Sequence, residues 1–217
     1  MALTLVIGNK NYSSWSLRPW LALAHNRIPF DEVVIPIATA ETAAQIRTYS
    51  PAGTVPVLLD GDATVWESIA ILAHLGERFP EAKLWPKEHA ARAHARAISC
   101  EMHSGFSALR RECPMNLKRK KKRPLTPEAA ADVRRVTELW RDARSRFGAD
   151  GDFLFGDFSA ADCMYAPVAT RIVSYEIDVD AVSAAYIDAI YRLAAFREWQ
   201  KAALAETWGH PVTDATA

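Results

Sequence analysis

The chain changes character near residue 82. Before that point, short apolar runs alternate with segments of helical periodicity, in the order strand, helix, strand, helix, strand, strand, helix. Beyond it, strand patterns almost vanish and apolar residues recur at helical spacing. A chain of 217 residues has room for two such units. We therefore expect an α/β domain over residues 1–81 and an all-helical domain over residues 82–217.

The first of these domains is expected to contain a small mixed sheet. Residues 2–8 and 31–37 are predicted strands, and the helix between them favours a parallel crossover. Residues 55–66 contain two short runs about a turn at Gly61, which is typical of an antiparallel hairpin. We expect helices on both faces of this sheet.

The second domain is expected to be a bundle of amphipathic helices. Apolar spacing from Ile98 to Cys113 predicts that residues 101–116 lie on one long helix. On a continuous helix His103, Phe106 and Arg110 would share a face, while Arg111 would be displaced by about 100°. Three further segments show helical patterns, at residues 133–147, 158–173 and 186–206.

Charge and cysteine usage argue against several classes of protein. The 26 basic residues balance the 26 acidic ones, which argues against a general attraction to nucleic acid or to a membrane surface. The three cysteines form no C-x-x-C pair, so no zinc spacing is present and no metal is expected. Because we find neither an export signal nor a run of 18 apolar residues, we expect a cytoplasmic protein.

The stretch NYSSWSLRPW, residues 11–20, places a serine pair directly before a helix. A serine in this position is most often an N-cap. It can also donate a hydrogen bond to a bound thiolate, because a hydroxyl and a helix N-terminus both favour the charged sulfur. No G-x-S-x-G pattern surrounds Ser13 or Ser14, which argues against a serine protease. The two interpretations of the pair stay open here.

Two further pairs carry the same ambiguity. Proline at position 56 would be ordinary at the start of a strand, but we predict a cis bond that leaves the Val55 backbone free to pair with an extended peptide. Glu67 and Ser68 open a helix, where such residues commonly act as caps. The alternative is a ligand site, in which helix amides and the Ser68 hydroxyl hold a carboxylate and Glu67 holds an ammonium group.

Two other motifs are assigned mainly to structure. Ser159 to Asp162 fits a capping box before an apolar helix, so we give it a folding role and place Cys163 in the core. Lys118 to Arg123 is a run of six basic residues. We interpret it chiefly as a solvated loop near a pocket rim, with attraction of anionic substrates or of nucleic acid as alternatives.

Taken in chain order, these motifs resemble a known family. The segments SSWSLRPWLAL, VPVL, ESIAILAHL and GDFSAADCMYAPV are similar to those of cytosolic glutathione transferases, and the resemblance covers nearly the whole chain. It implies a thioredoxin-like domain followed by a helical bundle. The first segment is of the serine type, similar to the zeta class, in which S-S-x-S-x-R opens the first helix. The implied activity is attack of the glutathione thiolate on a small electrophile in detoxification, by a homodimer without a metal.

The resemblance also implies roles for single residues. Ser13, five residues before Arg18, matches the thiol-activating serine in the zeta register, while Ser14 matches it in other serine-type classes. The Val55–Pro56 pair would bind the peptide backbone of glutathione, and the Glu67–Ser68 pair would bind its γ-glutamyl end. Helix residues of the second domain would line the electrophile pocket together with Trp15; the candidates are His103, Phe106, Arg110 and Arg111.

One departure and one alternative accompany this assignment. Trp15 stands where the zeta pattern has cysteine, which argues against isomerisation of maleylacetoacetate and leaves glutathione binding intact. The alternative function is a non-catalytic adaptor that keeps the fold for protein contacts. Such proteins commonly lose the serine or the acidic–serine pair, and this chain keeps both.

Overall fold

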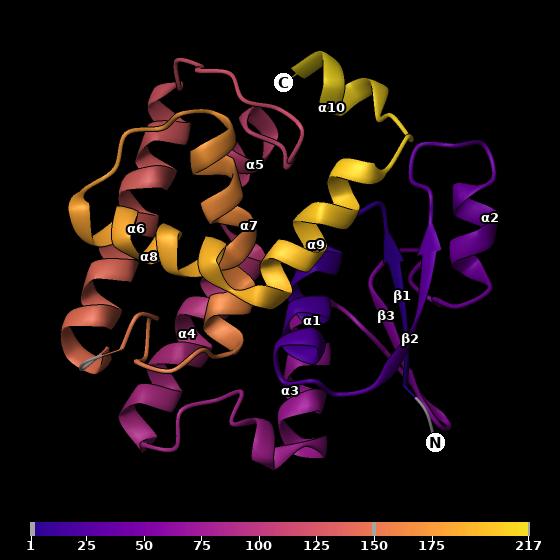
Figure 1. Ribbon diagram of the computed structural model, residues 1–217, viewed down its shortest axis with the longest axis horizontal. Coiled ribbons are helices and arrows are strands. Elements are labelled where there is room, and N and C mark those ends of the chain that lie inside the picture. Colours follow the sequence, from indigo (N-terminus) through magenta and orange to yellow (C-terminus); the bar gives the residue numbers. More distant parts are fainter. Residues whose placement is uncertain (1–2, 149–150, 217) are drawn as a thin grey trace.

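The computed structural model describes residues 3–148 and 151–216 (Figure 1). Its N-terminal part contains a four-stranded sheet in the order β2-β1-β3-β4. The first two strands pair in parallel, and the other two pairings are antiparallel. The predicted mixed sheet and its hairpin are therefore confirmed. The strands are β1 (Leu3–Gly8), β2 (Phe30–Ile35), β3 (Val57–Asp60) and β4 (Ala63–Trp66).

Helices cover both faces of this sheet because the side chains of β1 alternate. Leu5 and Ile7 join the main core cluster with the helices α1 (Ser14–His25) and α3 (Ser68–Arg78). Val6 points the other way and belongs to a second, smaller cluster. That cluster includes Ile46 of the short helix α2 (Thr42–Arg47), which lies on the opposite side of the sheet in Figure 1.

The rest of the chain is helical. The central helix α7 is buried along almost its whole length and packs against α1 and α4. Among the described residues, no helix is long and apolar enough to cross a membrane. The elements are η1 (Pro80–Ala82), α4 (His89–Ser104), α5 (Ser107–Glu112), α6 (Pro127–Phe147), α7 (Ala160–Ser174), α8 (Ala181–Arg192), α9 (Ala194–Ala205) and α10 (Pro211–Thr216).

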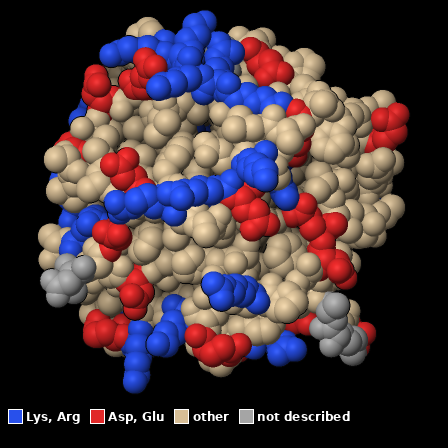
Figure 2. Space-filling view, in the orientation of Figure 1, with Lys and Arg blue, Asp and Glu red and all other residues tan. Residues whose placement is uncertain are grey.

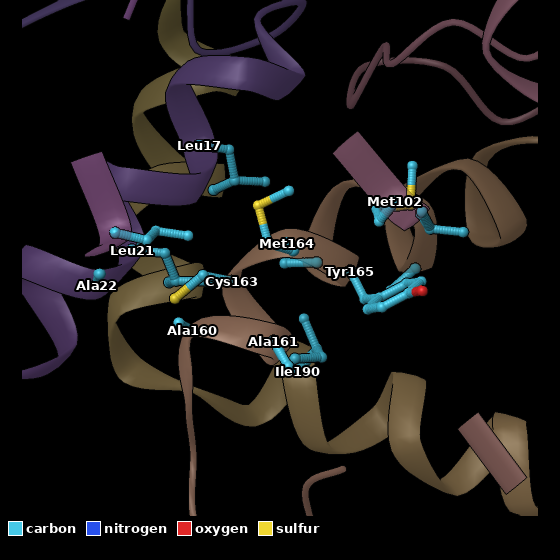
Figure 3. Packing of buried hydrophobic residues seen from close by; sticks show 14 of the residues in the cluster. Leu17, Leu21, Ala22, Met102, Ala160, Ala161, Cys163, Met164, Tyr165 and Ile190 are labelled. Carbon is cyan, nitrogen blue, oxygen red and sulfur yellow. The ribbon is translucent and has the colours of Figure 1, made fainter. Parts of the chain in front are cut away.

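One hydrophobic core runs across the predicted boundary between the two parts. Figure 3 shows Leu17 and Leu21 of α1 beside Cys163 and Met164 of α7, and all four side chains are fully buried. Cys163 is thus a core residue, as the sequence predicts. Because α1 packs directly on α7, residues at the start of α1 lie within reach of the helical part.

The expectation of a single helix over residues 101–116 is wrong. Helix α4 ends at Ser104, and α5 begins three residues later. A Cβ at Gly105 would lie 2.8 Å from the Glu101 carbonyl oxygen, and Phe106 has a φ of 59°, so the helical path breaks here. The face that His103, Phe106 and Arg110 would share on a continuous helix therefore does not exist.

The predicted capping box at the start of α7 is confirmed. The Asp162 carboxylate accepts hydrogen bonds from the Ser159 backbone N–H and hydroxyl, each at 2.8 Å, and from the Leu154 N–H at 3.1 Å. Asp162 is fully buried, and its burial raises its pKa to about 6. This carboxylate fixes the loop before α7 and takes no part in the candidate site.

The basic run lies in the connection between α5 and α6, where Lys and Arg side chains gather at the top of Figure 2. Lys118 Nζ donates to the Glu206 carbonyl, and Arg119 Nη1 donates to the Asp214 carbonyl at 3.1 Å. The Glu206 carboxylate in turn accepts from the backbone N–H groups of Lys10 and Asn11, at 2.6 and 3.0 Å. The run thus helps to hold the C-terminal segment against the loop that precedes α1.

Candidate functional site

A cavity of about 200 Å³ lies where the N-termini of α1 and α3 meet the turn before β3. It gathers residues that are far apart in sequence and that include both predicted pairs. The Val55–Pro56 peptide bond is cis, which confirms that prediction. The cavity is lined by Trp15, Thr54, Val55, Pro56, Glu67 and Ser68.

Glu67 occupies an unusual backbone position at the edge of this cavity. It is the residue before α3, with φ 67° and ψ 121°, and its side chain makes no capping hydrogen bond. A positive φ in a residue other than glycine costs on the order of 1–3 kcal/mol and persists only where the surroundings enforce it. The carboxylate is 51% exposed, and its Oε2 lies 3.4 Å from His103 Nε2. Glu67 is therefore the N-cap residue of α3 by position only, and its carboxylate faces His103 at the junction of the two parts of the chain.

The two serines before and at the start of α1 have different partners. The Ser13 hydroxyl donates to Ser16 Oγ at 2.7 Å, and Ser16 Oγ also accepts from the Gly8 N–H at 3.1 Å. Ser13 is the N-cap residue by position, but its side chain makes no capping bond. Ser14 Oγ instead accepts a hydrogen bond from Arg171 Nη2 at 3.2 Å. Both serines keep a little exposed surface, 7% for Ser13 and 8% for Ser14.

Trp15 forms one wall of the cavity, and two arginines pack against its ring. The guanidinium carbon of Arg18 lies 4.1 Å from its ring centroid, and that of Arg110 lies 4.7 Å away. His103 meets the same ring edge-on at 5.3 Å between centroids. The structure therefore brings together Trp15, His103 and Arg110, three of the residues predicted for the electrophile pocket.

The other two predicted pocket residues lie elsewhere. Phe106 is 7% exposed and belongs to the main core cluster, and Arg111 is exposed on α5. Arg110 is held in place by the end of α4, because its Nη2 donates to the carbonyls of Met102, His103 and Gly105 at 2.6, 2.9 and 2.6 Å. It thus supplies partners for carbonyl groups that a helix leaves unpaired at its C-terminus.

Two buried arginines belong to the site, and neither received a functional role from the sequence. Arg18 is 1% exposed and donates to Ser68 Oγ at 3.2 Å, while Arg171 is 4% exposed. Burial lowers the pKa of Arg171 to about 10 and lowers that of Arg18 too. In the described part of the chain, no carboxylate lies within ion-pair distance of Arg18, Arg110 or Arg171.

The sequence contains one signal that could have identified these buried arginines. Arginine is almost never fully buried unless it is paired, and Arg171 interrupts the apolar stretch VATRIV. Ser68 is also fully buried, and its hydroxyl accepts the hydrogen bond from Arg18 at the lining of the cavity. Across residues 3–148 and 151–216, no cluster of three or more His, Cys, Asp or Glu could hold a metal ion.

A thioredoxin-like sheet, a cis proline before β3 and a helical part packed on α1 define the architecture of the glutathione transferases. Residues 12–78 match the family described as glutathione S-transferase, N-terminal domain. The resemblance predicted from the sequence is thus confirmed for the fold and for this domain.

Relatives extend the likeness over most of the chain. A probable maleylacetoacetate isomerase of Caenorhabditis elegans is 27% identical over 192 residues, which covers 81% of this chain and 90% of that protein. Glutathione S-transferase Z1 of Arabidopsis thaliana is 30% identical over 100 residues, 44% of this chain and 43% of that protein. The crystal structure of a Burkholderia glutathione transferase homologue with bound glutathione has a TM-score of 0.72 at 19% identity, covering 95% of this chain and 100% of that one.

Proposed function

We propose that the protein is a serine-type glutathione transferase, in which the thiolate of glutathione attacks a small electrophile. The observation that carries this proposal is the cavity that joins the Val55–Pro56 turn to the start of α3. The Val55 backbone, beside the cis bond, would pair with the peptide backbone of glutathione. The amides at the start of α3 would hold the γ-glutamyl carboxylate, and Glu67 would hold its ammonium group.

Ser14 is the better candidate for the donor to the thiolate, although the zeta register favours Ser13. A serine hydroxyl has a single hydrogen to donate. The hydrogen of Ser13 is directed to Ser16 Oγ. Ser14 Oγ accepts from Arg171, which leaves its own hydrogen free to reach a ligand. The positive end of α1 would add to the stabilisation of the thiolate.

The electrophile would lie on the helical side of the cavity. Trp15 lines the cavity there, and His103 and Arg110 pack against its ring, so this wall combines an aromatic face with positive charge. Such a wall suits an apolar or partly anionic electrophile. By analogy with the family, the working form would be a homodimer in the cytoplasm.

The test of this function is retention on immobilised glutathione, followed by calorimetry and by conjugation assays with a panel of electrophiles. We expect specific retention, release by free glutathione, and conjugation of at least one electrophile. Binding without any turnover would favour a non-catalytic adaptor. Absence of binding would contradict the proposal.

A further inference from the structure

Arg171 extends from the helical part of the chain to the start of α1. It lies near the end of α7, and one nitrogen, Nη1, donates to the Pro167 carbonyl of its own helix at 3.0 Å. The other, Nη2, donates to Ser14 Oγ at 3.2 Å, between residues 157 positions apart in the chain. Within the described residues, its Nε has no hydrogen-bond partner.

The surroundings of Arg171 do not neutralise its charge. Arg110 faces it from α5 and Arg18 lies nearby on α1, so the nearest charged groups are also cations. Cys113 and Tyr175 also face it, and burial raises their pKa values to about 11 and about 12, which keeps both groups neutral at pH 7. Glu67 and His103 lie further out, at the cavity edge, where they face each other.

A buried cation without a counter-ion is unfavourable, and it becomes less so when an anion binds nearby. Ser14 accepts a hydrogen bond from this cation and directly precedes Trp15, which lines the cavity. Since Arg171 occupies the acceptor side of the Ser14 oxygen, the hydroxyl hydrogen must point elsewhere. An anion at the start of α1 would meet both that hydrogen and the positive charge behind it.

We propose that Arg171 is a positioning residue that directs the Ser14 hydroxyl toward the glutathione sulfur and stabilises the thiolate through it. The inference rests on the proposed function and deepens it. When glutathione ionises, the thiol proton leaves to solvent and Ser14 keeps its hydrogen, which it donates to the sulfur anion. The helical part of the chain thereby contributes to thiol activation as well as to electrophile binding.

Arginine suits this role better than lysine because its planar group holds several donors in a fixed arrangement. One donor is fixed on Pro167 and a second on Ser14, so the side chain cannot turn away from the hydroxyl. A lysine would keep the charge but could donate a well-directed hydrogen bond to only one of these two acceptors. Arg171→Lys and Arg171→Met therefore separate charge from geometry.

The experiment measures the pH dependence of thiolate absorbance for glutathione bound to the full chain. The variants are Arg171→Met, Arg171→Lys, Ser14→Ala and the double variant Arg171→Met with Ser14→Ala. Arg197→Met, at an exposed arginine on α9, is the matched control. Calorimetric affinity for glutathione and the circular dichroism spectrum are recorded for every variant, so that loss of binding or of folding is seen separately.

We expect Arg171→Met to raise the apparent pKa of the bound thiol by about one unit, while Arg171→Lys gives a smaller rise and Arg197→Met gives none. In the Ser14→Ala background, Arg171→Met should add little further shift. An unshifted profile in Arg171→Met overturns the inference. The inference is also overturned if Arg171→Met causes the full pKa shift in the Ser14→Ala background, because the arginine would then act on the thiolate through space and not through the Ser14 hydroxyl. If Arg171→Met does not fold, the measurement is made on Arg171→Lys instead. The positioning role is contradicted if Arg171→Lys leaves the apparent pKa of the bound thiol unchanged and leaves the effect of Ser14→Ala on that pKa unchanged. Failure of the parent protein to bind glutathione would instead contradict the proposed function itself.

Discussion

Glu67 Oε2 and His103 Nε2 lie 3.4 Å apart across the junction between the sheet and the helical part of the chain. The contact links the edge of the predicted glutathione site to the wall of the predicted electrophile site. Burial lowers the pKa of His103, and the Glu67 carboxylate opposes that shift. The two halves of the candidate site are therefore in direct contact through these two side chains.

Glu67→Ala should weaken glutathione binding more than it slows the reaction of bound glutathione. Losing a hydrogen-bonded charge partner typically costs about 1.5–3 kcal/mol, which corresponds to roughly a 10- to 150-fold weaker affinity. Calorimetry with glutathione measures the effect, and Glu77→Ala, at an exposed position of the same helix, is the control. An affinity equal to that of the parent would show that Glu67 does not hold the ligand.

Glu67→Gly should separate the backbone role of this residue from its side-chain role. Glycine adopts a positive φ without steric cost, so this variant should be more stable than Glu67→Ala by about 1 kcal/mol. Thermal or urea unfolding of the two variants gives the difference. Both should bind glutathione equally weakly, and a Gly variant less stable than the Ala variant would contradict the strain at this position.

Asp162→Ala should destabilise the fold without changing the properties of the bound thiol. The Leu154 and Ser159 backbone N–H groups would lose their buried acceptor, so the free energy of unfolding should fall by about 3 kcal/mol. Asp157→Ala, at an exposed position of the same loop, should change it by less than about 0.5 kcal/mol. Equal effects of the two substitutions in denaturant unfolding would rule out the capping role.

The free energy of unfolding should fall as the pH is lowered below 7, and His94 should account for part of this fall. His94 lies on α4 and packs against Phe147 of α6 and Phe155 of the loop before α7, and its burial lowers its pKa. The unfolded chain thus takes up this proton at a higher pH than the folded chain. The stabilisation is full above the unfolded pKa, about 6.5, and is lost as the pH falls through the lower folded value. His94→Gln should flatten the pH dependence of unfolding, whereas His89→Gln, exposed on the same helix, should leave it steep.

The sheet could be predicted from the sequence because its signals are local. The strand at residues 3–8 alternates between two cores, and the turn at Gly61 joins two short strands directly. The cavity residues also lie at the ends of these elements, so the order of the motifs along the chain was enough to group Val55, Pro56, Glu67 and Ser68.

The helix break and the buried arginines could not be predicted in this way. Apolar spacing continues through Gly105, and a single glycine does not by itself end a helix. The break becomes evident only when Arg110 folds back onto the carbonyls at the end of α4. Likewise, the contact between Arg171 and Ser14 depends on the packing of α7 against α1, which no local pattern encodes.

We propose that the serine pair at the start of α1 activates the glutathione thiol and that Ser14 is the donor. The most direct measurement is thiolate absorbance of bound glutathione as a function of pH in the parent, Ser13→Ala and Ser14→Ala proteins. We expect Ser14→Ala to raise the apparent pKa of the bound thiol by at least about one unit, with glutathione still bound, and Ser13→Ala to raise it less. A larger shift in Ser13→Ala would assign the role to Ser13, and an unshifted profile in both variants would contradict the serine mechanism.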